Sequence, residues 1–331
     1  MGWPLGFDAK IAGLTRAILP RPLIYAHRGG AALRPENTFV AFDHGLALGA
    51  DGLELDVHLS RDGVVVVHHD STLERTTNAR GAIRLKTAAE LAAIDAGYRF
   101  VATPDAGGRL PANQPPLKLR RSAEALAQAE AGSHTHADEI RTEAGSRKED
   151  GVASGFSRKN QPGEFPYRGQ GIGVPTLREV LARYPVPLII ELKTPEAALA
   201  RATVDELRAA DAVGRVALGS FYGRGLHAAR AYEPRIATGA AREETRWALY
   251  KSWVHWPIRR PAFREFQVPE RSGRTTIVTP RFVRYAHRAS LTVKVWTVDA
   301  HEDIARLLSW GVDAIISDRP DVAVVAGGAE S

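Results

Sequence analysis

Short β-prone runs alternate with helical patterns along most of this 331-residue chain. This alternation predicts parallel strands joined by crossover helices. We predict strands at residues 23–26, 52–57, 64–68, 187–192, 215–220, 235–239, 275–278, 293–298 and 313–317. We predict helices at residues 37–49, 87–95, 176–184, 200–211, 223–231, 280–288 and 301–310. Roughly eight strand–helix units favour the α/β class and a (β/α)₈ TIM-type barrel over an open doubly wound sheet.

Local signals mark individual helix ends. Thr176 precedes Glu179 by three residues, which predicts a capped helix start with acidic charge in its first turn. Gly49 and Gly311 stand where two of the predicted helices end, as glycine commonly does.

The alternation stops over a middle segment that is poor in apolar residues. From Gln128 to Gly151 the only bulky aliphatic or aromatic residue is Ile140. Such a segment cannot offset its ordering entropy by burial. We therefore predict one barrel domain over residues 1–331, with its core at about 22–100 and 173–322, a mobile insertion at about 101–172 and a helix at 119–131 within it.

Composition excludes several kinds of site. There are no cysteines, so disulfides, thiolate zinc sites and cysteine nucleophiles are absent, while a site of oxygen ligands for a hard cation remains open. No stretch approaches the roughly 18 apolar residues of a membrane span. Residues 1–20 have Lys10 and Arg16 as their basic residues and lack a continuous apolar core, which is atypical of a secretory signal. We expect a cytoplasmic protein.

Residues with catalytic chemistry follow several of the predicted strands. His27 ends the first strand within a glycine turn. Glu54 and Asp56 lie two residues apart on the next strand, so both side chains point to the same side. Glu191 follows an apolar run on another strand, and in a barrel these strand ends meet at one face. Two or three carboxylates at one place suit Mg²⁺ or Ca²⁺.

A second histidine site completes what phosphodiester cleavage needs, namely a cation, an acid, a base and positive charge on the phosphate. His68 and His69 both stand at the end of the third predicted strand, with Asp70 after them. His58 falls two residues beyond Asp56, so it could also line the site.

Each assignment has a structural alternative. A Glu-x-Asp pair on a strand is often solvated surface, but apolar residues flank this pair, and buried carboxylates need partners. A histidine at a strand end is often structural. Glu36 either approaches the metal or caps the helix that opens at Asn37, and we favour a supporting role. Trp296 either walls the site or is plain core.

A series of motifs resembles the glycerophosphodiester phosphodiesterase family. The resemblance covers roughly residues 22–98 and 173–322. Its motifs are Ala26–Gly30, Pro35–Thr38, Gly49–Val57, Arg61–Gly63, His69–Thr77, Gly173–Leu177, Ile190–Lys193, Val295–Asp299 and Ser317–Pro320.

The resemblance implies a barrel hydrolase that uses a divalent cation, Mg²⁺ or Ca²⁺. It implies metal ligands at Glu54, Asp56 and Glu191, and a general acid and base at His27 and His69. The family pattern of His-Asp followed two residues later by Leu selects His69 over His68. Arg28 and Lys193 would contact the phosphate, which agrees with the planar fork of arginine and the point charge of lysine, and Trp296 would face the alcohol portion.

An aromatic and basic stretch departs from a minimal member of this family. Residues 247–263 hold three tryptophans, and residues 251–288 hold nine Lys/Arg against Glu265 and Glu270. That segment alone accounts for the whole +6 surplus of the chain. Tryptophan with arginine or lysine is typical of a membrane interface. The alternative is an ordinary helix whose aromatic side chains pack on the barrel.

These observations lead to one function hypothesis and two rivals. The first is metal-dependent hydrolysis of glycerophosphodiesters to sn-glycerol 3-phosphate and an alcohol. The second is a lysophospholipase D that acts on lysophospholipids at an anionic membrane surface, with peripheral membrane contact. The third is a non-catalytic protein that binds phospholipid or nucleic acid, against which the acid–base pair speaks. We expect no nucleic-acid partner.

Overall fold

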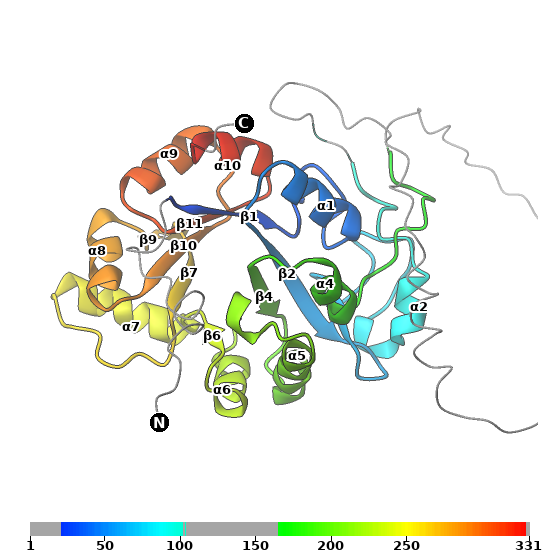
Figure 1. Ribbon diagram of the computed structural model, residues 1–331, viewed down its shortest axis with the longest axis horizontal. Helices are drawn as coiled ribbons and strands as arrows, with labels where there is room; N and C mark the ends of the chain where they lie inside the picture. The colour runs from blue at the N-terminus through cyan, green and yellow to red at the C-terminus, as the bar shows by residue number, and fades with distance from the viewer. Residues whose placement is uncertain (1–20, 102, 104–164, 329–331) are drawn as a thin grey trace, which may run out of the picture.

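The computed structural model describes residues 21–101, 103 and 165–328. Parallel strands at its centre form a ring that helices surround (Figure 1). Among the described residues these parallel strands are β1 (Leu23–His27), β2 (Gly52–Leu59), β4 (Leu188–Leu192), β5 (Val216–Gly219), β6 (Ala237–Thr238), β7 (Glu265–Pro269), β10 (Thr292–Trp296) and β11 (Ala314–Ser317). Their order is β6-β5-β4-β2-β1-β11-β10-β7.

The two ends of this order meet, so the sheet closes. Gly239 and Glu265 form a parallel bridge between the chain after β6 and the start of β7. The backbone N–H of Ala240 donates to the Glu265 carbonyl at 2.9 Å, and that of Arg264 donates to the Thr238 carbonyl at 3.0 Å. The predicted (β/α)₈ TIM-type barrel is confirmed, because closure with helices outside is that architecture.

The helices that follow the strands cover the outside of the ring. They are α1 (Phe39–Ala47), α2 (Ala88–Ala92), α4 (Leu177–Arg183), α5 (Ala197–Ala209), α6 (Gly223–Tyr232), α7 (Arg242–Trp253), α8 (Pro280–Arg288), α9 (His301–Ser309) and α10 (Pro320–Ala326). Short 3₁₀ turns form at η1 (Ile83–Leu85) and η2 (Val213–Arg215). Strand β3 (Val65–Val67) pairs antiparallel with β2, and β8 (Arg271–Ser272) pairs with β9 (Thr275–Thr276) in a hairpin after β7.

The local signals act as the sequence predicts. The Thr176 hydroxyl accepts from the backbone N–H of Glu179, whose side chain accepts in return from the N–H of Thr176, so α4 begins with a capping box. Gly49 and Gly311 have φ of 96° and 88°, just after α1 and α9 end. Only glycine takes this left-handed conformation without steric cost, so both helices stop there.

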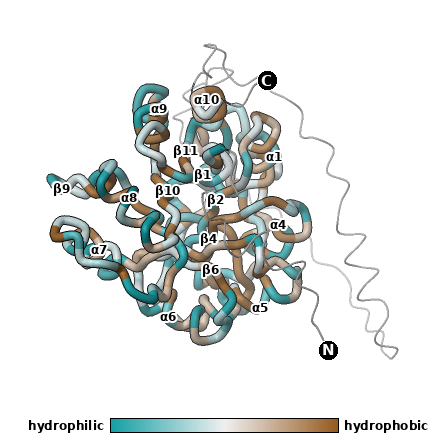
Figure 2. Tube along the Cα trace, turned by 60° about the vertical axis from the view of Figure 1, so that its left-hand side comes forward, coloured by the Kyte–Doolittle hydropathy of each residue, from teal (hydrophilic) through white to brown (hydrophobic). Residues whose placement is uncertain are grey.

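The core lies between the strands and the helices. Leu53, Leu55 and Val57 alternate along β2 with the site residues and are fully buried on the helix side. Hydrophobic residues gather along the central strands, whereas the outer helices carry both hydrophobic and hydrophilic residues (Figure 2). The alternation leaves the other face of each strand free to carry polar groups into the barrel.

One predicted strand lies outside the barrel sheet, and the strand that takes its place was not predicted. The predicted strand at 64–68 forms β3, which pairs antiparallel with β2 and is not one of the parallel strands of the ring. We expected a strand at 275–278, but Thr275–Thr276 belongs to the β8–β9 hairpin, and β7 at Glu265–Pro269 supplies the barrel strand. The β-branched residues at 275–278 favour a strand by propensity. Strand β7 instead turns the polar side chains of Glu265 and Gln267 inward, where Lys294 Nζ lies 2.9 Å from Glu265. Residues Glu265–Pro269 do alternate polar and apolar side chains, but the run is short and ends at a proline, so its sequence signal for a strand is weak.

Residues 165–172 fall within the segment that we predicted as an insertion, and they pack on the barrel. Tyr167 and Ile172 are buried in a cluster with Leu91 and Ala96. The predicted helix at 119–131 and most of the predicted insertion lie outside the described residues. None of the described helices is long and apolar enough to cross a membrane.

Candidate active site

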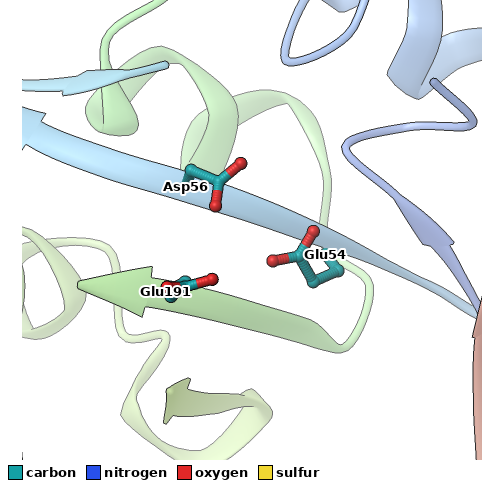
Figure 3. A group of neighbouring side chains, drawn as sticks. All are labelled: Glu54, Asp56 and Glu191. Carbon is teal, nitrogen blue, oxygen red and sulfur yellow. The ribbon is translucent and has the colours of Figure 1, made fainter. Parts of the chain in front are cut away.

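Three carboxylates converge where β2 and β4 lie side by side. The parallel register pairs Asp56 with Glu191, and Glu54 stands two residues earlier on the same face of β2. Figure 3 shows the carboxylates of Glu54 and Asp56 on the same side of β2 as that of Glu191 on β4. One oxygen from each lies within 4.8 Å of the others. The arrangement can hold one cation among oxygen ligands.

The electrostatics of these carboxylates fit a divalent cation. Burial raises the pKa of Glu54, and Asp56 raises it further. Burial also raises the pKa of Glu191, with Asp56 adding to the rise although Lys193 opposes it. Oδ1 of Asp56 is buried and accepts no hydrogen bond from a described residue. Without a metal, burial and mutual repulsion therefore disfavour the ionised form of these carboxylates, and hard oxygen ligands suit Mg²⁺ or Ca²⁺.

Asp56 is held from several sides. The Asn37 amide nitrogen donates to its Oδ2 at 2.9 Å, and the Asp56 backbone N–H donates back to Asn37 Oδ1 at 3.3 Å. Arg28 Nε lies 3.2 Å from Oδ2, and Lys193 Nζ lies 3.3 Å from Oδ1. Lys193 Nζ also lies 3.2 Å from Glu191. These contacts fix the central carboxylate and place two cations beside it.

The glycine turn after β1 brings Arg28 to the carboxylates. Arg28 and Gly29 have φ of 49° and 86°. A Cβ at Gly29 would lie 2.7 Å from Ala41 of α1, so only glycine allows the turn to rest on that helix. The Arg28 backbone N–H donates to Glu54 at 3.2 Å, and its guanidinium lies 3.1 Å from Glu36.

His27 stands between two carboxylates. In the β1–β2 register it pairs with Glu54, and its Nε2 lies 3.7 Å from that carboxylate. Its Nδ1 lies 2.6 Å from Oδ1 of Asp318, at the end of β11. Burial lowers the pKa of His27, but Glu54 and Asp318 outweigh it and raise the pKa to about 9. Metal-free, His27 is therefore protonated near neutral pH.

His69 and His68 occupy different surroundings. His69 lines the same cavity as His27, and its Nδ1 lies 2.7 Å from Oδ1 of Asp70. Burial lowers the pKa of His69, which keeps its ring neutral near pH 7. His68 is buried away from that cavity with Nε2 3.3 Å from the Thr72 carbonyl. His58 reaches the backbone of His69, with Nε2 3.1 Å from its carbonyl.

Glu36 belongs to an ion-pair network beside the carboxylates, not to their cluster. Arg75 donates to both oxygens of Glu36 at 2.6 and 2.7 Å, and Arg28 donates at 3.1 Å. Although burial raises the pKa of Glu36, Arg75 and Arg28 lower it to about 2. Arg75 also contacts Asp70, the partner of His69. One network therefore links Arg28, through Glu36 and Arg75, to the carboxylate that holds His69.

The site opens into a cavity of about 660 Å³. Its catalytic end is lined by His27, Arg28, Glu54, His69, Glu191 and Lys193. Trp296 lines the next part, and its ring meets Phe221 edge-on with 5.6 Å between the ring centroids. The cavity then continues along α7 and the β8–β9 hairpin. All residues predicted for the site meet here, with Asp56 buried beneath Arg28 and Lys193.

Residues 27–322 match the model of the glycerophosphoryl diester phosphodiesterase family. The chain belongs to this family. The resemblance predicted from the sequence motifs is confirmed, and membership makes the chain a phosphoric diester hydrolase. A glycerophosphodiester phosphodiesterase of Caldanaerobacter subterraneus subsp. tengcongensis is 27% identical over 304 residues, which cover 92% of this chain and 97% of that protein.

Solved structures share the fold of this family. A glycerophosphoryl diester phosphodiesterase domain from Mycobacterium tuberculosis aligns with a TM-score of 0.66 at 22% identity, covering 92% of this chain and 98% of that one. A phosphodiesterase of Oleispira antarctica, solved with the product sn-glycerol-3-phosphate, aligns with a TM-score of 0.59 at 22% identity, covering 92% and 96%. At these identities the likeness bears on the fold alone.

Four residues that hold the site together received no role from sequence reasoning. They are Asn37, Asp70, Arg75 and Asp318. Asp70 adjoins His69 and could have been paired with it from the sequence alone. Asp318 lies 291 residues from His27, so no local signal joins them. In the phosphodiesterase barrel the two meet because β1 and β11 are neighbouring strands.

Proposed function

We propose that this phosphodiesterase hydrolyses glycerophosphodiesters to sn-glycerol 3-phosphate and an alcohol, using a divalent cation. The carrying observation is that an acidic triad, two carboxylate-held histidines and two cations surround one end of one cavity. The relatives add support, since one is named a glycerophosphodiester phosphodiesterase and another was solved with sn-glycerol-3-phosphate. Glu54, Asp56 and Glu191 would hold the cation, which when bound supplies Lewis-acid polarisation of a phosphate oxygen.

The positively charged side chains of Arg28 and Lys193 bind the phosphate. Arg28 and Lys193 line the cavity, and both lie against Asp56, so their charge is held at the catalytic end. Arginine offers two parallel donors to phosphate oxygens, and lysine offers a compact charge. They stabilise the negative charge that builds on the phosphate during attack.

The two histidines divide the proton transfers. Asp70 accepts from Nδ1 of His69, so Nε2 is left as the basic nitrogen, and a lowered pKa keeps it available. We assign His69 as the base that takes the proton of the attacking hydroxyl. Oδ1 of Asp318 lies 2.6 Å from Nδ1 of His27 and favours its protonated form, so we assign His27 as the acid that protonates the leaving oxygen. Opposed environments of two titratable groups favour such a division.

Replacing Asp318 by asparagine tests this assignment. We expect Asp318→Asn to lower kcat by on the order of 10²-fold, because His27 loses the carboxylate that orients its ring. Removing that anion also lowers the pKa of His27, so the alkaline limb of kcat/KM moves to lower pH. The measurement is a pH profile with metal present, with Glu302→Gln, an exposed residue of α9, as control. An unchanged profile would contradict the assignment.

A lysophospholipid is the second candidate substrate. The cavity does not stop at the catalytic end but continues past Leu249, Tyr250 and Trp253 of α7 and past Ile277. This apolar wall lies beyond the residues that we propose to hold the phosphate, and an acyl chain would gain from contact with it. Such a substrate would bring the enzyme into peripheral contact with a membrane.

Paired substrates separate the two candidates. Each pair holds a glycerophosphodiester and the lysophospholipid with the same headgroup, assayed below the critical micelle concentration with Mg²⁺ or Ca²⁺. We expect hydrolysis of the deacylated member in at least one pair. If the apolar wall serves an acyl chain, the acylated member reaches at least the same kcat/KM. An acylated rate below about one hundredth of the deacylated rate, a cost of about 2.7 kcal/mol, rules out the second candidate.

A further inference from the structure

Exposed aromatic and aliphatic side chains form a ridge on α7 and the turn after it. We call Trp247, Tyr250, Trp253, Val254 and Trp256 the aromatic ridge. Trp247 is 60% exposed, Val254 71% and Trp256 64%, so these side chains do not pack on the barrel. Large apolar groups gathered in solvent mark an interaction site.

The ridge is held in one shape. The rings of Trp247 and Tyr250 meet edge-on at 6.1 Å, and those of Tyr250 and Trp253 lie 5.3 Å apart. They follow one another at a spacing of three residues, which places them along one side of the helix. The Tyr285 hydroxyl of α8 donates to the Trp256 carbonyl at 2.7 Å, so the turn after α7 is tied to the next helix.

The surroundings of the ridge carry positive charge that no ion pair among the described residues offsets. None of the nine Lys/Arg residues of 251–288 forms an ion pair with a residue in the described ranges. The two glutamates of that segment are already paired, Glu265 with Lys294 and Glu270 with Arg306. Helices α7 and α8 lie side by side, with β9 next to α8 (Figures 1 and 2). The elements that carry the positive charge therefore lie next to the helix that carries the ridge.

The ridge continues into the active-site cavity. Tyr250 and Trp253 belong to the ridge and also line the cavity, as do Arg242 and Arg246 of the same helix. Helix α7 thus presents aromatic side chains to solvent and to the route that leads to the catalytic end.

We propose that the aromatic ridge docks on an anionic lipid bilayer and holds the cavity mouth at the lipid surface. Tryptophan and tyrosine are stable at the headgroup level, and arginine and lysine are attracted to anionic lipids. A second copy of the chain fits less well, because a two-fold contact would set the unpaired arginines of both copies against each other. The proposal rests on the proposed function, since it gives that cavity access to membrane-borne substrates.

Vesicle binding tests the docking surface without turnover. We expect the protein to sediment with vesicles of equal parts phosphatidylcholine and phosphatidylglycerol at low salt, and not with pure phosphatidylcholine. Binding should be lost near 1 M salt, where the Debye length is about 3 Å. Trp247→Ala with Trp256→Ala should weaken binding at least about tenfold, because each removes a large exposed apolar group. These two residues do not line the cavity, so the double variant should keep kcat/KM on a soluble glycerophosphodiester within about twofold.

Two matched controls separate apolar contact from charge and from general surface change. Leu85→Ala removes a 56% exposed apolar side chain from η1 and should leave vesicle binding unchanged. Arg259→Gln with Arg260→Gln should weaken binding on the order of tenfold, while Arg80→Gln with Arg84→Gln, two exposed arginines elsewhere, should not.

Several results would overturn the proposal. The first two are absence of binding to the anionic vesicles at low salt, and vesicle binding that is the same in the parental protein and in the double tryptophan variant. The third is salt-sensitive binding to duplex DNA that is as strong as vesicle binding and does not depend on the tryptophans. The fourth is a dimer that depends on the tryptophans and does not bind vesicles. Failure of the proposed function looks different. In that case the parental protein would bind vesicles and yet hydrolyse no glycerophosphodiester.

Discussion

Replacing Glu54 by glutamine is expected to lower kcat/KM for a glycerophosphodiester by at least about 10³-fold. The change keeps the shape of the side chain and removes the charge of one of the three carboxylates that we propose as metal ligands. Metal polarisation of a phosphate supplies several kcal/mol of transition-state stabilisation, and each 1.36 kcal/mol is tenfold in rate. The measurement is turnover at saturating Mg²⁺ or Ca²⁺, and a chelator should abolish the parental activity.

The same variant should keep its fold and lose its response to metal. Burial and Asp56 raise the pKa of Glu54, so its ionised form is unfavourable in the folded metal-free protein, and a neutral amide does not share this penalty. Bound metal should raise the Tm of the parental protein. At a free metal concentration of 100 times Kd, binding adds about 2.7 kcal/mol to the free energy of unfolding. In Glu54→Gln this shift should shrink or vanish, as read by thermal unfolding with and without cation.

The direction in which the Tm of the metal-free protein changes with pH provides a further test. The raised pKa of Glu54 means that the folded protein keeps a proton that the unfolded chain releases near pH 4.3, so stability falls as pH rises above that value. His27, with a pKa of about 9, stabilises the fold fully below 6.5, and this contribution is lost as pH rises through 9. Both effects have the same sign, and Glu54→Gln should flatten the fall.

Glu302→Gln provides the control. Glu302 is exposed on α9, so this substitution removes one carboxylate without touching the cavity. Parental turnover in Glu54→Gln without added cation would show that the metal assignment is wrong. Loss of the folded circular dichroism spectrum would instead mean that Glu54 is structural. Glu191→Gln, a change at the other side of the triad, should then reproduce the loss of turnover in a folded protein.

Replacing His69 by alanine should lower kcat by at least on the order of 10²-fold, the lower size of an acid–base contribution. His69 lines the cavity with its Nδ1 held by Asp70, so the change removes the base that the mechanism assigns. The matched control is the neighbouring His68→Ala. His68 is buried with Nε2 at the Thr72 carbonyl, and its loss should reduce stability while kcat of the folded protein stays within about threefold.

His68 and His69 are adjacent in the sequence, so the two alanine variants can be compared directly. The measurement is kcat at saturating substrate and metal. A large loss in His68→Ala with none in His69→Ala would reverse the assignment. Equal small losses in both would leave His27 as the sole proton-transfer group. The alkaline and acid limbs of the pH profile would then reduce to one.

The α/β alternation predicted most strands and helices, but it misplaced one barrel strand. Strand β7 carries Glu265 and Gln267 inward, and the long-range partner Lys294 makes that burial acceptable. The β-branched residues at 275–278 satisfied propensity and yet form only part of a hairpin. Propensity is local, whereas the contact that selects β7 depends on closure of the barrel.

For α7 the sequence left two alternatives, and the fold shows which aromatic side chains do not pack on the barrel. The composition of 247–263 suited either an interfacial surface or aromatic packing on the barrel. Trp247 and Trp253 are exposed, because Ala248, Leu249 and Ser252 form the side of α7 that faces the core. A helix has one buried side, and the tertiary contacts of α7 decided which residues lie on the other.

The sequence by itself determined the fold class, the family and the chemistry-bearing residues. Period-two and helical patterns set the elements, and the spacing of Glu54 and Asp56 placed both on one strand face. The tertiary structure decided which of these residues meet. Register pairs His27 with Glu54 and Asp56 with Glu191, and barrel closure brings Asp318 to His27 across 291 residues. Local patterns carry no register between distant strands, so such partners arise only when the whole sheet closes.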